Sequence, residues 1–333
     1  MQITFADARQ LVVDVLTKYA VAADHAGIVA DHLIDAAMAG HAFAGLPRVL
    51  ALVEHLKERP PAGPITIERK SPNSVTIDGG GTNGYVTSLI GIDKAIELAR
   101  ETGVGFVGIR NTWFSGRLAY YVERAANAGL VAMHTANTAA RVAPAGGIDR
   151  IFGTNPIAFA FPCEPDPLVI DFGTGLTTWG EVLLRKKLGK PVDAGSAVDP
   201  AGNPTLDPDL ALDGAILPWG GHRGSAISLV VQVLGILCGS HIVVEDVADC
   251  GFFFLVFKPD LLMPLAQFRT MVTNLVNHIE SSRPAPGISR VRVPGRSSSA
   301  HRAQAKQRGS IEVPEPVYQS LLALRGDRKH GPL

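Results

Sequence analysis

The chain has 333 residues, 46% of them hydrophobic and 19% charged, and its 31 basic and 31 acidic side chains leave no formal net charge. This length permits a large buried core and about two domains, while neutrality excludes a general attraction to nucleic acid or anionic membranes. No apolar run reaches the roughly 20 residues of a membrane span, and the N-terminus lacks the basic start and apolar core of a secretory signal.

The first part of the chain predicts helices. Apolar residues recur at helical spacing over positions 11–16, and again in a second helix that is expected over 23–39. A third helix is expected after Pro47, because the fixed φ of proline suits an early helical position. Prolines at 60, 61 and 64 then end the pattern, so we predict a helical part over residues 1–65.

From residue 66 onward, short β-like runs alternate with helical segments, which is typical of a mixed α/β protein. The runs are Ser74–Ile77, Val104–Arg110, Leu130–His134, Ile157–Phe161 and Leu168–Phe172. Helices are expected near 87–101, 117–128, 223–238, 265–281 and 313–325. We predict an α/β region over 66–264, with residues 265–333 packing against the helical part. Pro284–Gly309, rich in Pro, Ser, Gly and Arg, predicts a loop across the surface.

One glycine pattern matches a dinucleotide fingerprint but lacks its context. Gly103–Gly108 fits G-x-G-x-x-G, yet this motif must follow a strand and open a helix, so that phosphate meets the helix N-terminus. Here a predicted helix precedes Gly103, and Val104–Ile109 predicts the next strand. We interpret Gly103 as the residue that ends the helix.

Three other glycine-containing turns are better placed to bind a phosphate. Phe152–Pro156 lies before a predicted strand, Asp171–Gly175 follows one, and Leu217–Gly224 leads into a helix. Backbone amides in such turns can approach a pyrophosphate closely, and Arg223 adds positive charge. Each turn alone is a common loop, but the three in this order form a specific pattern.

The segment from Arg290 to Arg308 carries six basic side chains and no acidic one. It could bind a phosphate-bearing ligand or a partner, or it could be a solvated basic segment. The three cysteines, Cys163, Cys238 and Cys250, are scattered and include no C-x-x-C pair, which favours neither a disulfide framework nor a structural zinc site. We therefore expect a cytoplasmic protein without a bound metal.

Gly40–Arg48 has the frame of an active-site turn, Gly-x-x-Ser-His-Gly-x-x-Arg, in which Phe43 and Ala44 occupy the Ser and His positions. With this turn, the chain resembles the type-2 malate/L-lactate dehydrogenase family, which includes ureidoglycolate dehydrogenase, 2,3-diketogulonate reductase and piperideine-2-carboxylate reductase. The other segments that carry the resemblance are Gly105–Asn111, Tyr120–Gly129, Asn137–Thr138, Val142–Gly147, Gly153–Ala158, Asp171–Thr174, Leu217–Gly224, Gly251–Phe254 and Val293–Gly295.

The resemblance implies an NAD(P)-binding fold that is not a Rossmann fold, with residues 66–264 as the cofactor-binding region. It also implies an obligate homodimer with a site between domains, near the dimer interface. NADPH or NADH would be the cofactor, and the basic residues after Arg290 favour NADPH. By position, Arg48 would bind the substrate carboxylate through a two-pronged ion pair. The residues that would contact the cofactor are Asn155, Asp171, Gly173, Thr174, His222, Arg223 and Gly295.

The departures from the family pattern remove its acid/base groups. Ala44 stands at the position of the active-site histidine, and Phe114 stands at that of a second family histidine. Arg296 replaces the glutamate of a Pro-Gly-Glu segment that helps to hold the cofactor in the family. Three residues could compensate in part for the lost histidines, although each is also a common structural or surface residue: His41, Arg141 and His222.

Reducing a 2-oxo acid needs a hydride on carbon and a proton on the developing alkoxide, and a positioned acid contributes about 10²–10⁴-fold to such a step. A cyclic imine arrives already protonated and needs no strong acid from the protein. We therefore expect an oxidoreductase that transfers a hydride between nicotinamide and a small carboxylate-bearing 2-oxo or 2-hydroxy acid or cyclic imine. The alternatives are a relative that binds a dinucleotide or a carboxylate without catalysis, and a structural dimer.

Overall fold

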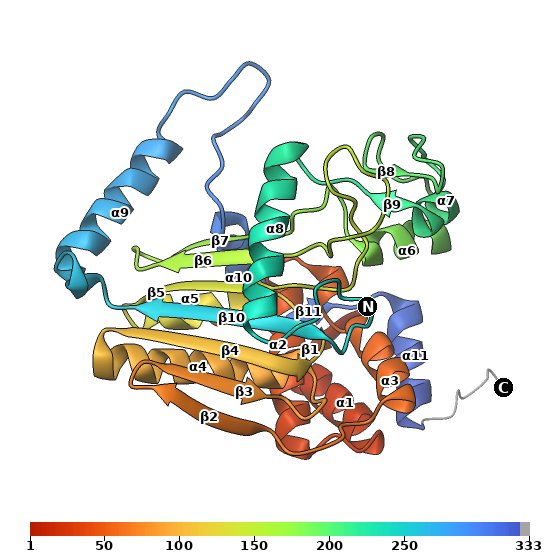
Figure 1. The fold of residues 1–333 in the computed structure, drawn as a ribbon, viewed down its shortest axis with the longest axis horizontal. Coiled ribbons are helices and arrows are strands. Elements are labelled where there is room, and N and C mark those ends of the chain that lie inside the picture. The colour runs from red at the N-terminus through yellow and green to blue at the C-terminus, as the bar shows by residue number, and fades with distance from the viewer. Residues whose placement is uncertain (327–333) are drawn as a thin grey trace.

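A computed structural model describes residues 1–326 (Figure 1). The structure confirms a mixed α/β fold with a helical N-terminal portion. Within the described residues, no helix has the length and apolar character needed to cross a membrane. Likewise, no three His, Cys, Asp or Glu side chains of residues 1–326 gather in a group that could hold a metal ion.

The N-terminal helices pack against the other end of the chain. Strand β1 (Gln2–Thr4) pairs antiparallel with β11 (Ser310–Glu312), and one hydrophobic core joins Leu11, Leu33 and Leu321. The helical elements of this part are α1 (Phe5–Lys18), α2 (Ala23–Met38), the 3₁₀ helix η1 (Ala42–Ala44), α3 (Arg48–Glu58) and, from the C-terminal end, α11 (Glu315–Arg325). The division of the chain at residues 65 and 265 stays a prediction.

A seven-stranded sheet forms the centre of the molecule, in the order β2-β3-β4-β10-β5-β6-β7. Its strands are β2 (Thr66–Ser71), β3 (Ser74–Asp78), β4 (Val104–Thr112), β5 (Val131–Ala136), β6 (Ile157–Phe161), β7 (Leu168–Phe172) and β10 (Cys250–Phe257). Within the described chain only β3 and β4 are parallel neighbours, and the other pairs are antiparallel. This arrangement differs from the parallel sheet of a Rossmann fold.

The two faces of the sheet are covered unequally. Helices α4 (Gly84–Thr102) and α5 (Ala119–Asn127) lie behind the sheet in Figure 1, and their face buries Val107, Phe252 and Phe254. Helix α8 (His222–Leu237) crosses the other face, where Phe106 remains 37% exposed. Because successive side chains of a strand point to opposite faces, one face of β4 and of β10 is buried and the other is only partly covered.

The central strand β10 was not predicted from the sequence. Its residues Cys250–Phe257 form a continuous apolar run, and periodicity does not distinguish a buried strand from a buried helix in such a run. The short length of the run was the available signal for a strand. By contrast, the interpretation of Gly103 is confirmed, since this residue has a φ of 95° and ends α4 just before β4.

The predicted loop over Pro284–Gly309 is wrong in its second half, where Arg296–Arg308 forms helix α10. This helix lacks an amphipathic pattern, so its sequence gave no periodic signal. Tertiary contacts hold it instead: Ala305 is buried, and Arg302 forms ion pairs with Asp35 of α2 and Glu123 of α5. Arg302 is therefore not part of a solvated basic segment.

The remaining elements lie at the two ends of the sheet. A small lobe contains α6 (Trp179–Lys187), β8 (Ala197–Val198), α7 (Pro208–Asp213) and β9 (Ala215–Ile216), with its own core around Val182 and Ile216. After the 3₁₀ helix η2 (Pro259–Leu261), helix α9 (Leu265–Glu280) lies at the left end of the sheet in Figure 1, away from the N-terminal helices. Its Val276 packs with Cys163 beyond β6 and with Val293.

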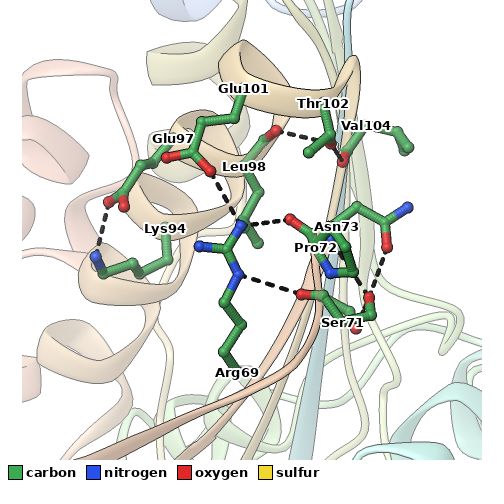
Figure 2. A network of polar contacts seen from close by, with 11 residues as sticks. Arg69, Ser71, Pro72, Asn73, Lys94, Glu97, Leu98, Glu101, Thr102 and Val104 are labelled. Carbon is green, nitrogen blue, oxygen red and sulfur yellow. Dashed lines mark hydrogen bonds and ion pairs between the residues drawn. The ribbon is translucent and has the colours of Figure 1, made fainter.

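The far edge of the sheet is fixed by a polar network that Figure 2 shows. Arg69 of β2 donates to the carbonyl oxygen of Pro72 at 2.6 Å and to Glu101 of α4 at 3.1 Å. The Thr102 hydroxyl donates to Val104 O at 2.7 Å. These contacts join the β2–β3 hairpin to the end of α4, at the opposite edge of the sheet from β7.

Candidate active site

Arg48 contacts the rings of Phe43 and Phe114. Its guanidinium carbon lies 4.6 Å from the ring centroid of Phe114 and 5.6 Å from that of Phe43. These are cation–π distances. Arg48 is half-buried, and within residues 1–326 it forms no ion pair with a carboxylate. Its charge is therefore available to an anion from solution.

The local backbone explains how Arg48 and the rings come together. Arg48 is the first residue of α3, directly after Pro47, and Phe43 lies one short turn earlier in η1. Phe114 follows β4 with a φ of 52°, a left-handed conformation that non-glycine residues rarely adopt. The strained backbone indicates that surrounding contacts hold this ring in place.

Phe43 also connects the N-terminal part to the small lobe. Its ring lies so close to the backbone of Gly180, near the start of α6, that a Cβ on Gly180 would overlap it. The guanidinium carbon of Arg141 lies 4.3 Å from the ring centroid of the neighbouring Trp179. Arg48 and Arg141, both predicted as catalytic, are thus linked through these aromatic contacts.

Arg141 lacks a carboxylate partner within the described part of the chain. Its guanidinium donates to the carbonyl oxygen of Ala140 at 3.1 Å. Burial and the neighbouring charge of Arg150 lower the pKa of Arg141. The group remains a cation that could stabilise negative charge, but a guanidinium is a poor proton donor at neutral pH.

His41 lies against α10. Its Nε2 is 3.2 Å from the hydroxyl of Ser298, and it forms no hydrogen bond with Arg48 or Arg141 in the part of the chain that the structure describes. Partial burial and the charge of Arg117 lower the pKa of His41, so the neutral imidazole predominates at pH 7. Its predicted role as a proton donor stays a prediction.

The predicted cofactor loops meet at the end of β7. Trp219 N donates to Thr174 O at 3.0 Å, which joins the turn after β7 to the loop that opens α8. Gly220 and Gly221 have φ values of 59° and 61°, conformations that favour glycine. The structure therefore brings two of the glycine-rich segments together.

The start of α8 has the properties of a diphosphate site. His222 and Arg223 are exposed, and neither forms an ion pair within residues 1–326. The space around the Cβ position of Gly221 is open. The amides of Arg223 and Gly224 are bonded to carbonyls of their own loop. The attraction would therefore come from the two side chains and from the N-terminal end of a 16-residue helix.

Two predicted cofactor residues support this region from the interior. The Asn155 amide donates to Ser228 O and Gln232 Oε1, each at 3.0 Å, and its oxygen accepts from Thr138 N at 3.2 Å. The buried Thr174 hydroxyl donates to Thr154 O and accepts from Ser228. Because these polar groups are already paired, both residues would act by positioning the loop rather than by touching a cofactor with their side chains.

Asp171 and the glycines around β7 have different surroundings. Asp171 accepts a hydrogen bond from Ala119 N at 2.8 Å and so caps the start of α5. Protein atoms surround this carboxylate closely, although part of it stays exposed, and burial raises the pKa of Asp171 against the opposing effect of that amide. Gly173 packs against Thr154 O, and Gly295, with a φ of 82°, packs against Val169 O of β7.

Sequence reasoning missed a buried ionic cluster beside these residues. Arg117 pairs with Asp35 at 2.7 Å, and Asp35 also pairs with Arg302 at 2.9 Å. The Arg117 side chain is only 10% exposed, and its backbone N donates to His32 Nε2 at 3.0 Å. The partners are 82 and 267 positions apart, so no local pattern could have revealed the cluster.

Comparisons with known proteins agree with this architecture. The malate/L-lactate dehydrogenase family model matches residues 3–322. The chain is 33% identical to the L-sulfolactate dehydrogenase of Methanocaldococcus jannaschii, over 94% of this chain and 93% of that protein. It is also 33% identical to the Delta(1)-pyrroline-2-carboxylate/Delta(1)-piperideine-2-carboxylate reductase of Pseudomonas aeruginosa, over 97% and 99% of the two chains.

A solved structure shows the same fold. The dehydrogenase from Sinorhizobium meliloti superposes with a TM-score of 0.89 at 29% identity, and the match covers 98% of each chain. The family match, the two relatives and this structure each extend over nearly the whole chain. The chain therefore belongs to the malate/L-lactate dehydrogenase family.

Proposed function

We propose that this protein is an NAD(P)-dependent oxidoreductase that transfers a hydride between nicotinamide and a small carboxylate-bearing substrate. The observation that carries the proposal is Arg48, a half-buried cation held by Phe43 and Phe114 without a carboxylate partner in the described chain. A guanidinium in this state binds a carboxylate through two parallel hydrogen bonds. The two rings would exclude water from that ion pair and orient it.

The same surroundings favour a cyclic imine as the substrate. Ala44 and Phe114 occupy the positions of the family histidines, so neither position can supply a proton. A protonated imine that accepts a hydride becomes a neutral amine, and it needs no proton from the protein in that step. One relative of this chain is a reductase of cyclic imino acids, which supports this choice.

A 2-oxo or 2-hydroxy acid is the second candidate substrate, and the name of the sulfolactate dehydrogenase relative favours it. Reduction of a 2-oxo acid would need a proton donor, for which His41 is the candidate, with Arg141 stabilising the developing charge. The lowered pKa of His41 leaves little of its imidazole protonated at neutral pH, and its Nε2 contacts Ser298, so it is a poor proton source there.

The cofactor would lie along the loops at the end of β7. When bound, a reduced nicotinamide supplies the hydride for the reaction. His222 and Arg223 would hold its diphosphate at the start of α8, and Gly173 would allow close approach of the backbone. Asn155 and Thr174 would keep these loops in place through their buried hydrogen bonds.

A homodimer is part of the proposal. Helix α8 exposes apolar side chains along one stripe, including Leu229, Val233 and Leu237, which are 53%, 54% and 73% exposed. The stripe lies beside the partly covered face of the sheet, where Phe106 is exposed. Monomeric proteins rarely expose a continuous apolar surface of this kind. A second copy of the chain, packed two-fold against the first, would bury it.

Titration of the purified protein with NADPH and NADH, followed by nicotinamide fluorescence, tests the cofactor part of the proposal. We expect saturable binding of at least one dinucleotide at sub-millimolar concentration. Binding without turnover of any imine or 2-oxo acid would favour a non-catalytic binding protein. If neither dinucleotide binds, the oxidoreductase proposal fails, and a structural dimer becomes the better account.

A further inference from the structure

A pocket of about 290 Å³ lies where α9 ends and α10 begins. Arg290, Arg292 and Arg296 line it together with Glu280 and Ser297. Its volume lies just below the range of about 300–1,000 Å³ that small-molecule sites occupy. The pocket is formed by residues other than the Arg48 cluster and the loops at the end of β7.

The pocket has an excess of positive charge. Arg296 pairs with Glu280 at 3.4 Å, and among the described residues this is the only carboxylate that lines the pocket. Arg290 and Arg292 are exposed and form no ion pair within residues 1–326. Two guanidinium charges therefore remain uncompensated, which matches the charge of a phosphate monoester.

The start of α10 adds to this attraction. Gly295 precedes the helix with a φ of 82° and no side chain caps the first turn. A 13-residue helix presents unpaired backbone N–H groups and the positive end of its dipole at this point. Phosphate oxygens accept hydrogen bonds from such groups and from arginine in the same geometry.

Strand β7 connects the pocket to the proposed diphosphate site. Gly295 packs against Val169 in this strand, and Gly173 follows the end of the same strand. Strand β7 thus runs from the residue beside the pocket toward the turn at Thr174, which is bonded to the loop that opens α8. NADH carries only a diphosphate, whereas NADPH carries a second phosphate on its adenosine ribose.

We propose that the pocket of Arg290, Arg292 and Arg296 binds the 2′-phosphate monoester of the dinucleotide and thereby selects NADPH over NADH. This inference rests on the proposed function and specifies its cofactor. In this inference Arg296 binds the 2′-phosphate. The glutamate of the family pattern could not do so, because a carboxylate would repel the phosphate.

The test compares dinucleotide affinities of the full-length wild type and the variants Arg292→Ala and Arg296→Ala by nicotinamide fluorescence. We expect the wild type to bind NADPH at least about tenfold more tightly than NADH. Each variant should lose most of that preference while its NADH affinity stays unchanged. Arg308→Ala, at the exposed far end of α10, is the matched control and should behave as wild type. Arg292 is exposed, so its variant tests the pocket even if Arg296→Ala does not fold.

Competition separates the possible sources of the phosphate. Adenosine 2′,5′-bisphosphate should displace NADPH, while 5′-AMP and inorganic phosphate at equal concentration should not. Equal wild-type affinities for NADPH and NADH would overturn the inference and leave the proposed function standing. An equal loss of both affinities in the variants, or equal competition by inorganic phosphate, would also overturn it. Failure of both dinucleotides to bind would overturn both proposals.

Discussion

Arg48 is the residue on which substrate binding should depend most. Replacing it by lysine keeps the positive charge but removes the planar guanidinium that contacts two rings and can bind a carboxylate at two points. We expect Arg48→Lys to raise KM for the carboxylate substrate by about tenfold or more, with a smaller change in kcat. Steady-state kinetics would measure this effect.

Arg69→Lys is the matched control for that experiment, because Arg69 lies at the far edge of the sheet (Figure 2). Its KM should equal that of the wild type. An unchanged KM in Arg48→Lys would show that the carboxylate binds elsewhere.

The lost histidine can be restored at the position where the family has it. We expect the double variant Phe43→Ser with Ala44→His to gain activity toward 2-oxo acids, since an imidazole in this turn could again donate a proton. The gain should be about 10²-fold over the wild type. A spectrophotometric assay of NADPH oxidation with a 2-oxo acid measures it, and Phe43→Ser alone serves as the control. No gain would mean that more than the proton donor has changed in this site.

At the residue scale, the sequence predicted loops and turns but not the contacts that their side chains make. Arg48 and Arg141 are each held by aromatic rings, which the sequence pattern did not indicate. In the structure, the side chains of Asn155 and Thr174 are buried and their polar atoms are already hydrogen-bonded within the protein. A local pattern identifies a loop, but the direction of each side chain depends on elements that lie far away in sequence.

At the scale of elements, Arg302 should be a main support of α10. It pairs with Asp35 and Glu123, and all three side chains are between 14% and 17% exposed. Arg302→Ala leaves the mostly buried Glu123 carboxylate without its ion-pair partner and removes one of the two partners of Asp35. We therefore expect it to lower the free energy of unfolding by about 2–4 kcal/mol. Urea denaturation would measure this loss.

Arg308→Ala in the same helix is the control, because its side chain is exposed. We expect its free energy of unfolding to stay within about 0.5 kcal/mol of the wild type. An equally small effect of Arg302→Ala would show that the ion pairs do not hold α10 in place.

His134 in β5 should make stability depend on pH. Burial lowers the pKa of His134 to about 3, and its Nδ1 donates to Phe253 O at 3.0 Å. The unfolded histidine, with a pKa near 6.5, binds a proton at a higher pH than the folded one, so stability falls as pH drops from about 6.5 toward 3. Between pH 7 and pH 5, His134 should lower the free energy of unfolding by about 2 kcal/mol.

The variant His134→Gln isolates that contribution, because it keeps a polar side chain that does not titrate. Its free energy of unfolding should decrease by about 2 kcal/mol less than that of the wild type between pH 7 and pH 5. Identical pH dependence of the two proteins would contradict the assignment of a buried neutral imidazole.

The elements that the sequence predicted well are those with strong periodicity or β-branched runs, such as α1, α2, β4 and β7. Strand β10 and helix α10 were missed for opposite reasons. The first is apolar throughout and the second has no apolar face, so neither shows a period. Both are specified by their neighbours: β10 by pairing with β4 and β5, and α10 by the ion pairs of Arg302.

At the scale of the whole molecule, the apolar stripe on α8 predicts the oligomeric state. Light scattering during gel filtration should give the wild type twice the mass of one chain. Val233→Glu places a charge in the centre of the proposed interface, and we expect it to shift the protein toward the monomer. Ile67→Glu on the edge strand β2, where the side chain is 45% exposed, should leave the dimer intact. A monomeric wild type would contradict this part of the proposal.

The most direct test of the account compares two substrates in one assay of NADPH oxidation by the purified wild-type protein: Δ1-piperideine-2-carboxylate and a 2-oxo acid of similar size. A site with an Arg48 carboxylate anchor and no histidine at positions 44 and 114 should reduce the imine with a kcat/KM at least about 10²-fold higher. The rate with the imine should follow the protonation of the substrate as pH is raised. Equal or faster reduction of the 2-oxo acid would contradict the account, since it would require an effective proton donor, for which His41 is the candidate.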